Sequence, residues 1–304
     1  MKSLTLEIIV PTYNRPDSIV AMFDSVLNQT LKPNKIAIVD AGSQSADYDK
    51  YRPLFQNHNI KFSLIRSIPG LTYQRNLGLK ELENDIALFL DDDVVLDSNY
   101  VSSMMSMFEN DNDMKIGGIT GKITNMSVTI SPLSLIFRKV FFMSRVKDGS
   151  LLSSGFPTAI DYKSQGISKV ESLSGCNMAY RSIVFETDKF DENLSRYAYM
   201  EDIDFSYRIS KRYDLIYIPE AQVAHNMAPQ ERLKDFERYR MLVHHHHYLF
   251  KKNVSSRFKY WMAHHISLIG IPLQALMLKR SLKGCKGALK AIAEIVANKK
   301  VFPL

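Results

Sequence analysis

Short apolar segments alternate with helical patterns through the first 120 residues, and this alternation restricts the fold more than any other feature. The apolar segments are residues 6–10, 36–39, 62–65 and 86–90. Short, mostly apolar segments bounded by polar residues are typical of buried parallel strands. The helical patterns between them cover residues 16–27, 45–57 and 72–83. This order predicts an α/β, Rossmann-like fold with a mostly parallel sheet and flanking helices.

Polar residues follow three of these predicted strands. They lie at residues 12–15, 40–43 and 91–93. Because ligands of such sheets bind beyond the carboxyl ends of the strands, we expect the three groups to form one site. Asp91 and Asp93 can face the same side of an extended chain, where two carboxylates repel each other unless a cation lies between them. Oxygen ligands of this kind suit Mg²⁺ or Mn²⁺.

Charge is distributed unevenly between the two ends of the chain. Residues 228–304 contain 15 Lys+Arg against 4 Asp+Glu, whereas residues 1–227 contain 24 against 28. An acidic body with a basic tail indicates a catalytic domain held to an anionic membrane surface. The tail has a long apolar block and lacks an interleaved stacking motif, so we expect no nucleic-acid partner. The start does not resemble a signal peptide, and two cysteines without metal-ligand spacing favour a cytoplasmic chain.

Three segments are candidates for membrane contact. Residues 260–278 are apolar and about long enough to span a bilayer, but His264 and Gln274 would be costly there. We therefore favour an interfacial or re-entrant helix, with a helix packed on the protein as the alternative. Residues 282–296 predict a basic amphipathic helix with Leu282, Cys285, Leu289, Ile292 and Val296 on its apolar face. Residues 133–143, which include Arg138 and Lys139, could form another membrane contact.

A run of four histidines, His244–His247, does not have the geometry of a metal site. Consecutive residues of a helix point about 100° apart, so four in a row cannot face one ion. We expect the run to lie on a helix surface, at a lipid or phosphate boundary.

Seven short motifs follow one another in a fixed order across about residues 5–226. They are residues 10–15 (VPTYNR), 39–43 (VDAGS), 75–78 (RNLG), 89–93 (FLDDD), 175–178 (GCNM), 201–204 (EDID) and His225. In this order they resemble a family 2 glycosyltransferase of the GT-A fold. The resemblance implies an enzyme that transfers a sugar, with inversion, from a nucleotide-diphosphate sugar to a saccharide. A lipid-linked acceptor in bacterial surface-polysaccharide synthesis would suit such an enzyme at a membrane.

The resemblance also implies a role for individual residues. Those implied in donor binding are Pro11, Thr12, Asn14, Arg15, Asp40, Arg75, Asp91 and Asp92. Asp40 would hold the base and Asp91 the ribose, while Asp93 would bind the metal, with His225 as a further ligand. The additional Asp92 leaves open which carboxylate takes the metal.

The acceptor side of the site is implied by the last motifs. Asp202 would be the general base, since it begins a predicted helix whose dipole favours the ionised carboxylate. Gly175, Asn177 and Glu201 would line the acceptor site.

These observations predict two domains. Residues 1–227 would form the catalytic domain, with a nucleotide-sugar half at about 1–121 and an acceptor half at about 122–227. Residues 228–304 would form a helical extension that associates with the inner membrane from the cytoplasm or mediates homo-oligomer formation. A sugar nucleotidyltransferase is one alternative, although it would need a glycine-rich loop where residues 11–16 stand. A non-catalytic scaffold is another, disfavoured by the intact acidic motifs and His225.

Overall fold

The computed structural model describes residues 3–43, 47–126, 131–144, 148–195, 197–226, 233–254 and 257–298. Its strands are β1 (Leu6–Thr12), β2 (Lys35–Asp40), β3 (Lys61–Arg66), β4 (Ile86–Leu90), β5 (Val94–Leu96), β6 (Ile116–Ile123), β7 (Ser168–Val170), β8 (Asn177–Arg181) and β9 (Asp214–His225). Its helices are α1 (Ser18–Leu27), α2 (Tyr48–Asn57), α3 (Leu71–Leu79), α4 (Tyr100–Glu109), α5 (Pro132–Val140), the 3₁₀ helix η1 (Ser182–Glu186), α6 (Glu201–Ile209), α7 (Asp235–Asn253), α8 (Phe258–Met277) and α9 (Leu282–Val296).

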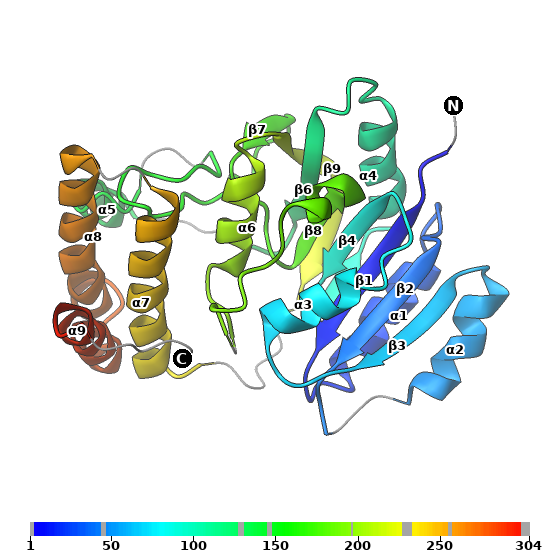
Figure 1. Cartoon of the computed structure of the whole chain (residues 1–304), viewed down its shortest axis with the longest axis horizontal. Coiled ribbons are helices and arrows are strands. Elements are labelled where there is room, and N and C mark those ends of the chain that lie inside the picture. Colours follow the sequence, from blue (N-terminus) through cyan, green and yellow to red (C-terminus); the bar gives the residue numbers. More distant parts are fainter. Residues whose placement is uncertain are drawn as a thin grey trace.

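The described strands form one sheet in the order β3-β2-β1-β4-β8-β6-β9-β5, with β7 beside β9 (Figure 1). The four strands predicted from sequence are confirmed and pair in parallel as β3-β2-β1-β4. Thr12 lies opposite Asp40 in this register, so the carboxyl ends of β1 and β2 meet at the same edge. Every residue of β1, β2 and β4 is buried, which explains why the sequence of each is largely apolar.

The second half of the sheet makes the fold mixed α/β. β8 runs antiparallel to both β4 and β6, and β9 runs antiparallel to β5 and β7. The sequence analysis had not identified β6, because its glycines obscure the strand pattern. Gly118 and Gly121 are needed there, since a Cβ at either would lie within 2.6 Å of a Tyr180 ring atom or the Ala221 carbonyl oxygen.

Helices α7, α8 and α9 form a helical unit at one end of the molecule, beside α5 and α6 (Figure 1). Its own apolar core includes Val243, Leu268, Ile271 and Ala288. α9 packs on α7 through small residues, and a Cβ on Gly287 would come 2.1 Å from the Phe236 carbonyl oxygen.

The apolar face predicted for α9 is largely exposed, although Cys285 is buried. Leu282, Leu289 and Val296, seven residues apart, are exposed by 59%, 52% and 81%. Ala288 and Ala291 are fully buried instead. Small side chains let two helix backbones approach closely, and this close packing decides which face turns inward. The exposed leucines and valine therefore form a stripe on the outer side of the extension.

α8 is packed on the protein by a side that combines apolar residues with its polar ones. His264, Ser267 and Gln274 are buried against neighbouring elements, whereas Trp261 and Ile269 are exposed. Phe258, Met262, Leu276 and Met277 are exposed as well. None of the helices in the described ranges combines the length and apolar character needed to cross a bilayer. The helix thus buries its costly polar groups in protein and presents an apolar outer side.

The prediction that the histidine run forms a helix surface is wrong. His244, His245 and His246 are exposed by only 3%, 0% and 0%. Each ring bonds a different neighbour, because successive positions of α7 face different elements. The His244 ring lies 2.9 Å from Glu294, His245 bonds the Tyr199 carbonyl oxygen, and His246 bonds Ser267. The run therefore connects α7 to α9, to the segment that precedes α6, and to α8.

α7 also contacts the helix that begins at Glu201. The Lys252 ammonium lies 2.9 Å from an Asp204 carboxylate oxygen and 2.6 Å from Asp191. The Asn253 side-chain amide donates to the other Asp204 oxygen. Asp204 is fully buried, so these contacts fix α6 against the helical unit.

Candidate active site

The end of β2 places Asp40 in a network with residues of two neighbouring segments. One carboxylate oxygen of Asp40 accepts a hydrogen bond from the Gly42 backbone N–H at 2.8 Å. The other lies 2.7 Å from the Arg66 guanidinium and 3.1 Å from the Tyr48 hydroxyl. Asn14, in the left-handed region at φ 52°, accepts from the Ser43 backbone N–H and joins the loops after β1 and β2. The implied base-binding residues thus lie together at one sheet edge.

Asp92 contacts residues at the end of β1 and in the loop that follows it. One Asp92 oxygen accepts from the Thr12 hydroxyl at 2.6 Å, and the other lies 3.2 Å from Arg15. Burial raises the pKa of Asp92 to about 6, although Thr12 and Arg15 oppose the rise. The geometry therefore ties Asp92 to the β1 loop.

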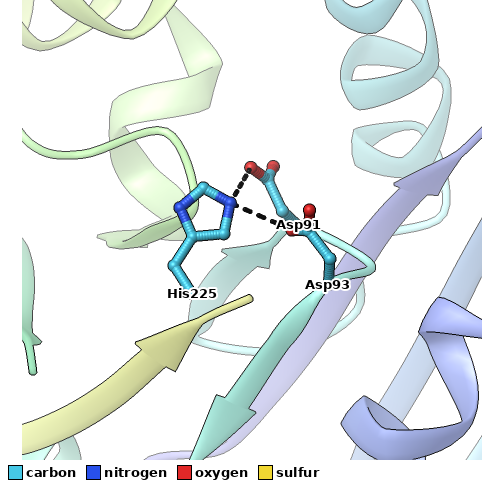
Figure 2. A group of neighbouring side chains, drawn as sticks. All are labelled: Asp91, Asp93 and His225. Carbon is cyan, nitrogen blue, oxygen red and sulfur yellow. Dashed lines mark ion pairs between the residues drawn. The ribbon is translucent and has the colours of Figure 1, made fainter. Parts of the chain in front are cut away.

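Asp91, Asp93 and His225 converge at the ends of β4 and β9 (Figure 2). Each offers one ligand atom, and the three atoms lie within 4.8 Å of one another. The His225 Nε2 is 3.0 Å from an Asp93 oxygen and 3.8 Å from an Asp91 oxygen. Burial lowers the pKa of His225, but hydrogen bonding to Asp93 and Cys176, together with the charge of Asp91, outweighs burial and raises that pKa to about 10. Two carboxylates and an imidazole converging in this way can hold a divalent cation.

Arg75 is a buried connection between the two sides of the site. Its guanidinium is 1% exposed, forms an ion pair with Glu201 and lies 3.7 Å from Asp91. It also donates to the Gly175 carbonyl oxygen at 2.9 Å. Burial raises the pKa of the Glu201 carboxyl, and the Arg75 charge opposes this. Arg75 therefore fixes the position of Asp91 relative to the start of α6.

Asp202 lies one residue further along α6 and lines a cavity of about 380 Å³. Its carboxylate accepts backbone hydrogen bonds at 2.9 Å from Gly175 and from Ile203. Burial raises the pKa of Asp202, and these two bonds oppose the rise. A Cβ on Gly175 would lie 3.2 Å from the Asp202 carboxylate, so the glycine backbone lies close against it. A fixed carboxylate facing a cavity is suited to accept a proton.

The remaining implied acceptor residues are buried in protein contacts. Asn177 is 0% exposed, and its side-chain oxygen accepts from the Thr120 hydroxyl and the Gly121 backbone N–H. Glu201 is 5% exposed and is engaged by Arg75. Neither residue lines the cavity that Asp202 lines. The contacts of Asn177 connect β8 to β6, and the contact of Glu201 with Arg75 connects α6 to α3.

Three residues that the sequence analysis did not single out help to build the site. The Gln74 side-chain amide donates to the carbonyl oxygens of Thr12 and Val39, which holds the ends of β1 and β2 together. Tyr48 and Arg66 contact Asp40. Gln74 directly precedes the RNLG motif, and this position is the one sequence feature that could have pointed to it. Nothing in the local sequence connects Tyr48 or Arg66 to Asp40.

Comparison with known proteins agrees with this geometry. Residues 7–185 match the family model described as "Glycosyl transferase family 2". The chain belongs to this glycosyltransferase family. The match spans more than half of the chain and includes β1 to β8, with Asp40, Arg75 and the three consecutive aspartates.

Two bacterial relatives and one solved structure illustrate the similarity. The chain is 28% identical over 246 residues to the O-antigen chain rhamnosyltransferase RfbN of Salmonella typhimurium, covering 78% of this chain and 70% of that protein. It is 27% identical over 144 residues to the UDP-Glc:alpha-D-GlcNAc-diphosphoundecaprenol beta-1,3-glucosyltransferase WfgD of Escherichia coli, covering 46% and 56%. The mannosyltransferase PcManGT of Pyrobaculum calidifontis, solved with GDP-Man and Mn²⁺, superposes with a TM-score of 0.57 at 15% identity. That superposition covers 99% of this chain and 82% of the other, and supports the GT-A fold.

Proposed function

We propose that this glycosyltransferase is an inverting, metal-dependent enzyme that uses a nucleotide-diphosphate sugar in bacterial surface-polysaccharide synthesis. The observation that carries the proposal is the linked arrangement of the Asp91–Asp93–His225 group, Arg75 and Asp202. The candidate cation-binding group and the candidate base are connected through Arg75 and the backbone of Gly175. The two named bacterial relatives support the setting: one is an O-antigen rhamnosyltransferase, and the other is a glucosyltransferase whose name gives a diphosphoundecaprenol-linked acceptor.

The donor would bind at the edge formed by β1, β2 and β4. Asp40, Thr12, Asn14 and Arg15 would contact the nucleoside, with Pro11 shaping the end of β1. Tyr48 and Arg66 border Asp40 and would extend this surface. Asp92 is engaged with Thr12 and Arg15, so it would support the nucleoside pocket through them.

Asp93 and His225 would hold the metal, with Asp91 as a third ligand or a contact to the ribose. Mixed oxygen and imidazole ligands fit Mn²⁺ better than Mg²⁺, which prefers oxygen ligands alone. When bound, such a cation supplies charge stabilisation to the leaving diphosphate. Metal ligands must be deprotonated, so His225 would lose the proton that it shares with Asp93.

Asp202 would act as the general base of a single displacement. It would accept the proton of an acceptor hydroxyl as that oxygen attacks the anomeric carbon. The bond between this carbon and the diphosphate oxygen would break, and attack from the opposite face would invert the configuration. The raised pKa of Asp202 brings the carboxylate nearer to the range in which a base is effective. Gly175 and Arg75 would keep it in position.

The extension of α7 to α9 would associate with an anionic membrane surface. Exposed apolar residues occur on α5, α8 and α9, and Lys283, Lys286 and Lys290 are exposed on α9. Apolar residues flanked by lysines are typical of helices that lie in a membrane interface. Such an arrangement suits a lipid-linked saccharide acceptor. Self-association through the same apolar surface is the competing explanation, and vesicle binding separates the two.

Calorimetric binding of UDP, GDP and dTDP, each with and without Mn²⁺, tests the donor site. We expect one nucleotide to bind tightly, only with the metal, and to lose this binding in Asp93→Asn. Asp113→Asn is the matched control, since Asp113 is an exposed carboxylate that pairs with Lys115 away from the site. Absence of nucleotide binding, or equal binding with and without metal, would contradict the proposal.

A further inference from the structure

The cavity beside Asp202 has lining groups that the transfer reaction does not use. It is lined by residues of α6, by the segments 157–163 and 172–174, and by Arg138 of α5. Tyr162 and Tyr199 contribute aromatic side chains, of the kind that stack on sugar rings. Its volume of about 380 Å³ is within the range of small-molecule sites. The cavity therefore offers room for a sugar and a further group beside the candidate base.

Arg138 is the unusual member of this lining. One of its terminal nitrogens donates to the Met143 carbonyl oxygen at 2.9 Å, and its guanidinium lies 5.8 Å from the Phe156 ring. Its Nε is buried and has no hydrogen-bond partner in the described part of the chain. Burial lowers the pKa of Arg138, and no carboxylate of the described residues contributes to offset this. A partly buried guanidinium without an acidic partner is costly unless an anion binds to it.

The helix that carries Arg138 is apolar on its outer side. Leu133, Ile136 and Val140, spaced as neighbours on one helix face, are exposed by 70%, 60% and 60%. Arg138 projects from the opposite side of α5 and reaches the cavity. Behind α5, Phe141 packs against Gly270 of α8, where a Cβ would come within 2.5 Å. One short helix thus combines an exposed apolar surface with a cation that lines the same cavity as Asp202.

We propose that the acceptor carries a phosphate or diphosphate ester and that Arg138 binds this group in the cavity that Asp202 lines. The idea rests on the proposed transferase function and adds the chemical class of the acceptor. Lys163, an exposed cation of the same lining, adds positive charge, while Asp161 and Asp202 are the carboxylates that an anion must avoid. The exposed stripe of α5 favours a phosphate attached to a lipid over a free sugar phosphate.

Binding of farnesyl diphosphate to the full chain tests the inference. EDTA is present throughout, so that the candidate metal group cannot hold the diphosphate. We expect calorimetry to show at least tenfold weaker binding in Arg138→Gln and partial recovery in Arg138→Lys. Lys139→Gln is the matched control, because it removes the same charge from an exposed neighbour on the same helix; its binding should change less than twofold.

Two further probes identify the source of the phosphate. Inorganic diphosphate that binds more weakly than farnesyl diphosphate, with the same dependence on Arg138, would support a lipid-linked acceptor. Equal affinity for the two would retain the anion site and overturn the lipid assignment. Farnesol that binds as well as farnesyl diphosphate, or equal effects of the Arg138 and Lys139 changes, would overturn the anion site.

Lys163→Gln and a nucleotide-binding assay distinguish loss of the anion site from loss of the fold. Lys163 is exposed, so its replacement should weaken farnesyl diphosphate binding without disturbing the fold. Arg138→Gln should retain the metal-dependent nucleotide binding of the unaltered protein, which shows that the chain is folded. If nucleotide binding fails in the unaltered protein while farnesyl diphosphate binding depends on Arg138, the transferase proposal fails and the anion site stands. If nucleotide binding depends on the metal as expected but farnesyl diphosphate binding does not depend on Arg138, the anion site fails and the transferase proposal stands.

Discussion

The Arg75–Glu201 pair gives the sharpest test of how the site is built. Arg75 is 1% exposed and Glu201 is 5% exposed, so removing the cation leaves a buried carboxyl without its charge partner. Breaking a buried pair from one side typically costs about 3–5 kcal/mol. We therefore expect Arg75→Met to lower the free energy of unfolding by about 4 kcal/mol at pH 7.

A double-mutant cycle separates the ion pair from simple loss of packing. Glu201→Gln alone leaves Arg75 with Asp91 at 3.7 Å and the Gly175 carbonyl oxygen at 2.9 Å, so its cost should be smaller. In the combined Arg75→Met and Glu201→Gln variant no buried charge of the pair remains. The double variant should therefore lose about 2 kcal/mol less free energy of unfolding than the sum of the two single losses. A coupling of this size is within the range measured for residues in contact.

The pH dependence has a defined sign. Burial raises the folded-state pKa of Glu201 above its unfolded value of about 4.3. Between these two pKa values the folded state binds more protons than the unfolded state, so this group makes stability fall as pH rises. Arg75→Met should extend that fall to higher pH, because the cation that opposes the rise in the Glu201 pKa is gone.

Urea unfolding of the four proteins between pH 5 and pH 8 measures these quantities. No control substitution at an exposed position is needed, because the two single variants are the reference for the double variant. Additive single effects, or an Arg75→Met variant whose stability does not fall towards pH 8, would refute the assignment of a charge-coupled pair.

Three other changes test the base, the packing of the extension and its outer surface. Asp202→Asn should lower kcat about 10²- to 10⁴-fold, with donor binding by calorimetry unchanged, because only the proton acceptor is lost. Gly287→Leu should destabilise the chain by about 1–3 kcal/mol in urea unfolding, since the Phe236 carbonyl oxygen occupies the space that a side chain would need. Ile269→Glu should reduce co-sedimentation with anionic lipid vesicles several-fold, because Ile269 is 57% exposed on the apolar side of α8.

Each of these three predictions has an outcome that would contradict it. Normal transfer by Asp202→Asn would show that another group accepts the proton. Ala293→Leu, at an exposed position of α9, is the control for Gly287→Leu, and equal losses in both would remove the close-packing explanation. Unchanged vesicle binding by Ile269→Glu, together with a loss of dimers in sedimentation, would favour self-association.

Local patterns predicted the parallel half of the sheet and the position of the acidic motif. An apolar segment buried on both faces has a composition that is visible in sequence, so β1, β2, β3 and β4 were identified. The spacing of Asp91 and Asp93 predicted their convergence, and the structure confirms that their carboxylates face one point. β6 and β8 were not identified, because long-range pairing defines them while their own composition is weakly patterned.

The sequence by itself determined which residue types follow each strand, and through the ordered motifs it determined the family. Only tertiary structure decided which side chains meet. Arg75 could be an exposed helix residue by local pattern, yet contacts with segments about 100 residues away bury it against Gly175 and Glu201. The histidine run was misjudged for the same reason. Burial depends on which surface another element covers, and that is set by contacts between distant segments, which local periodicity does not record.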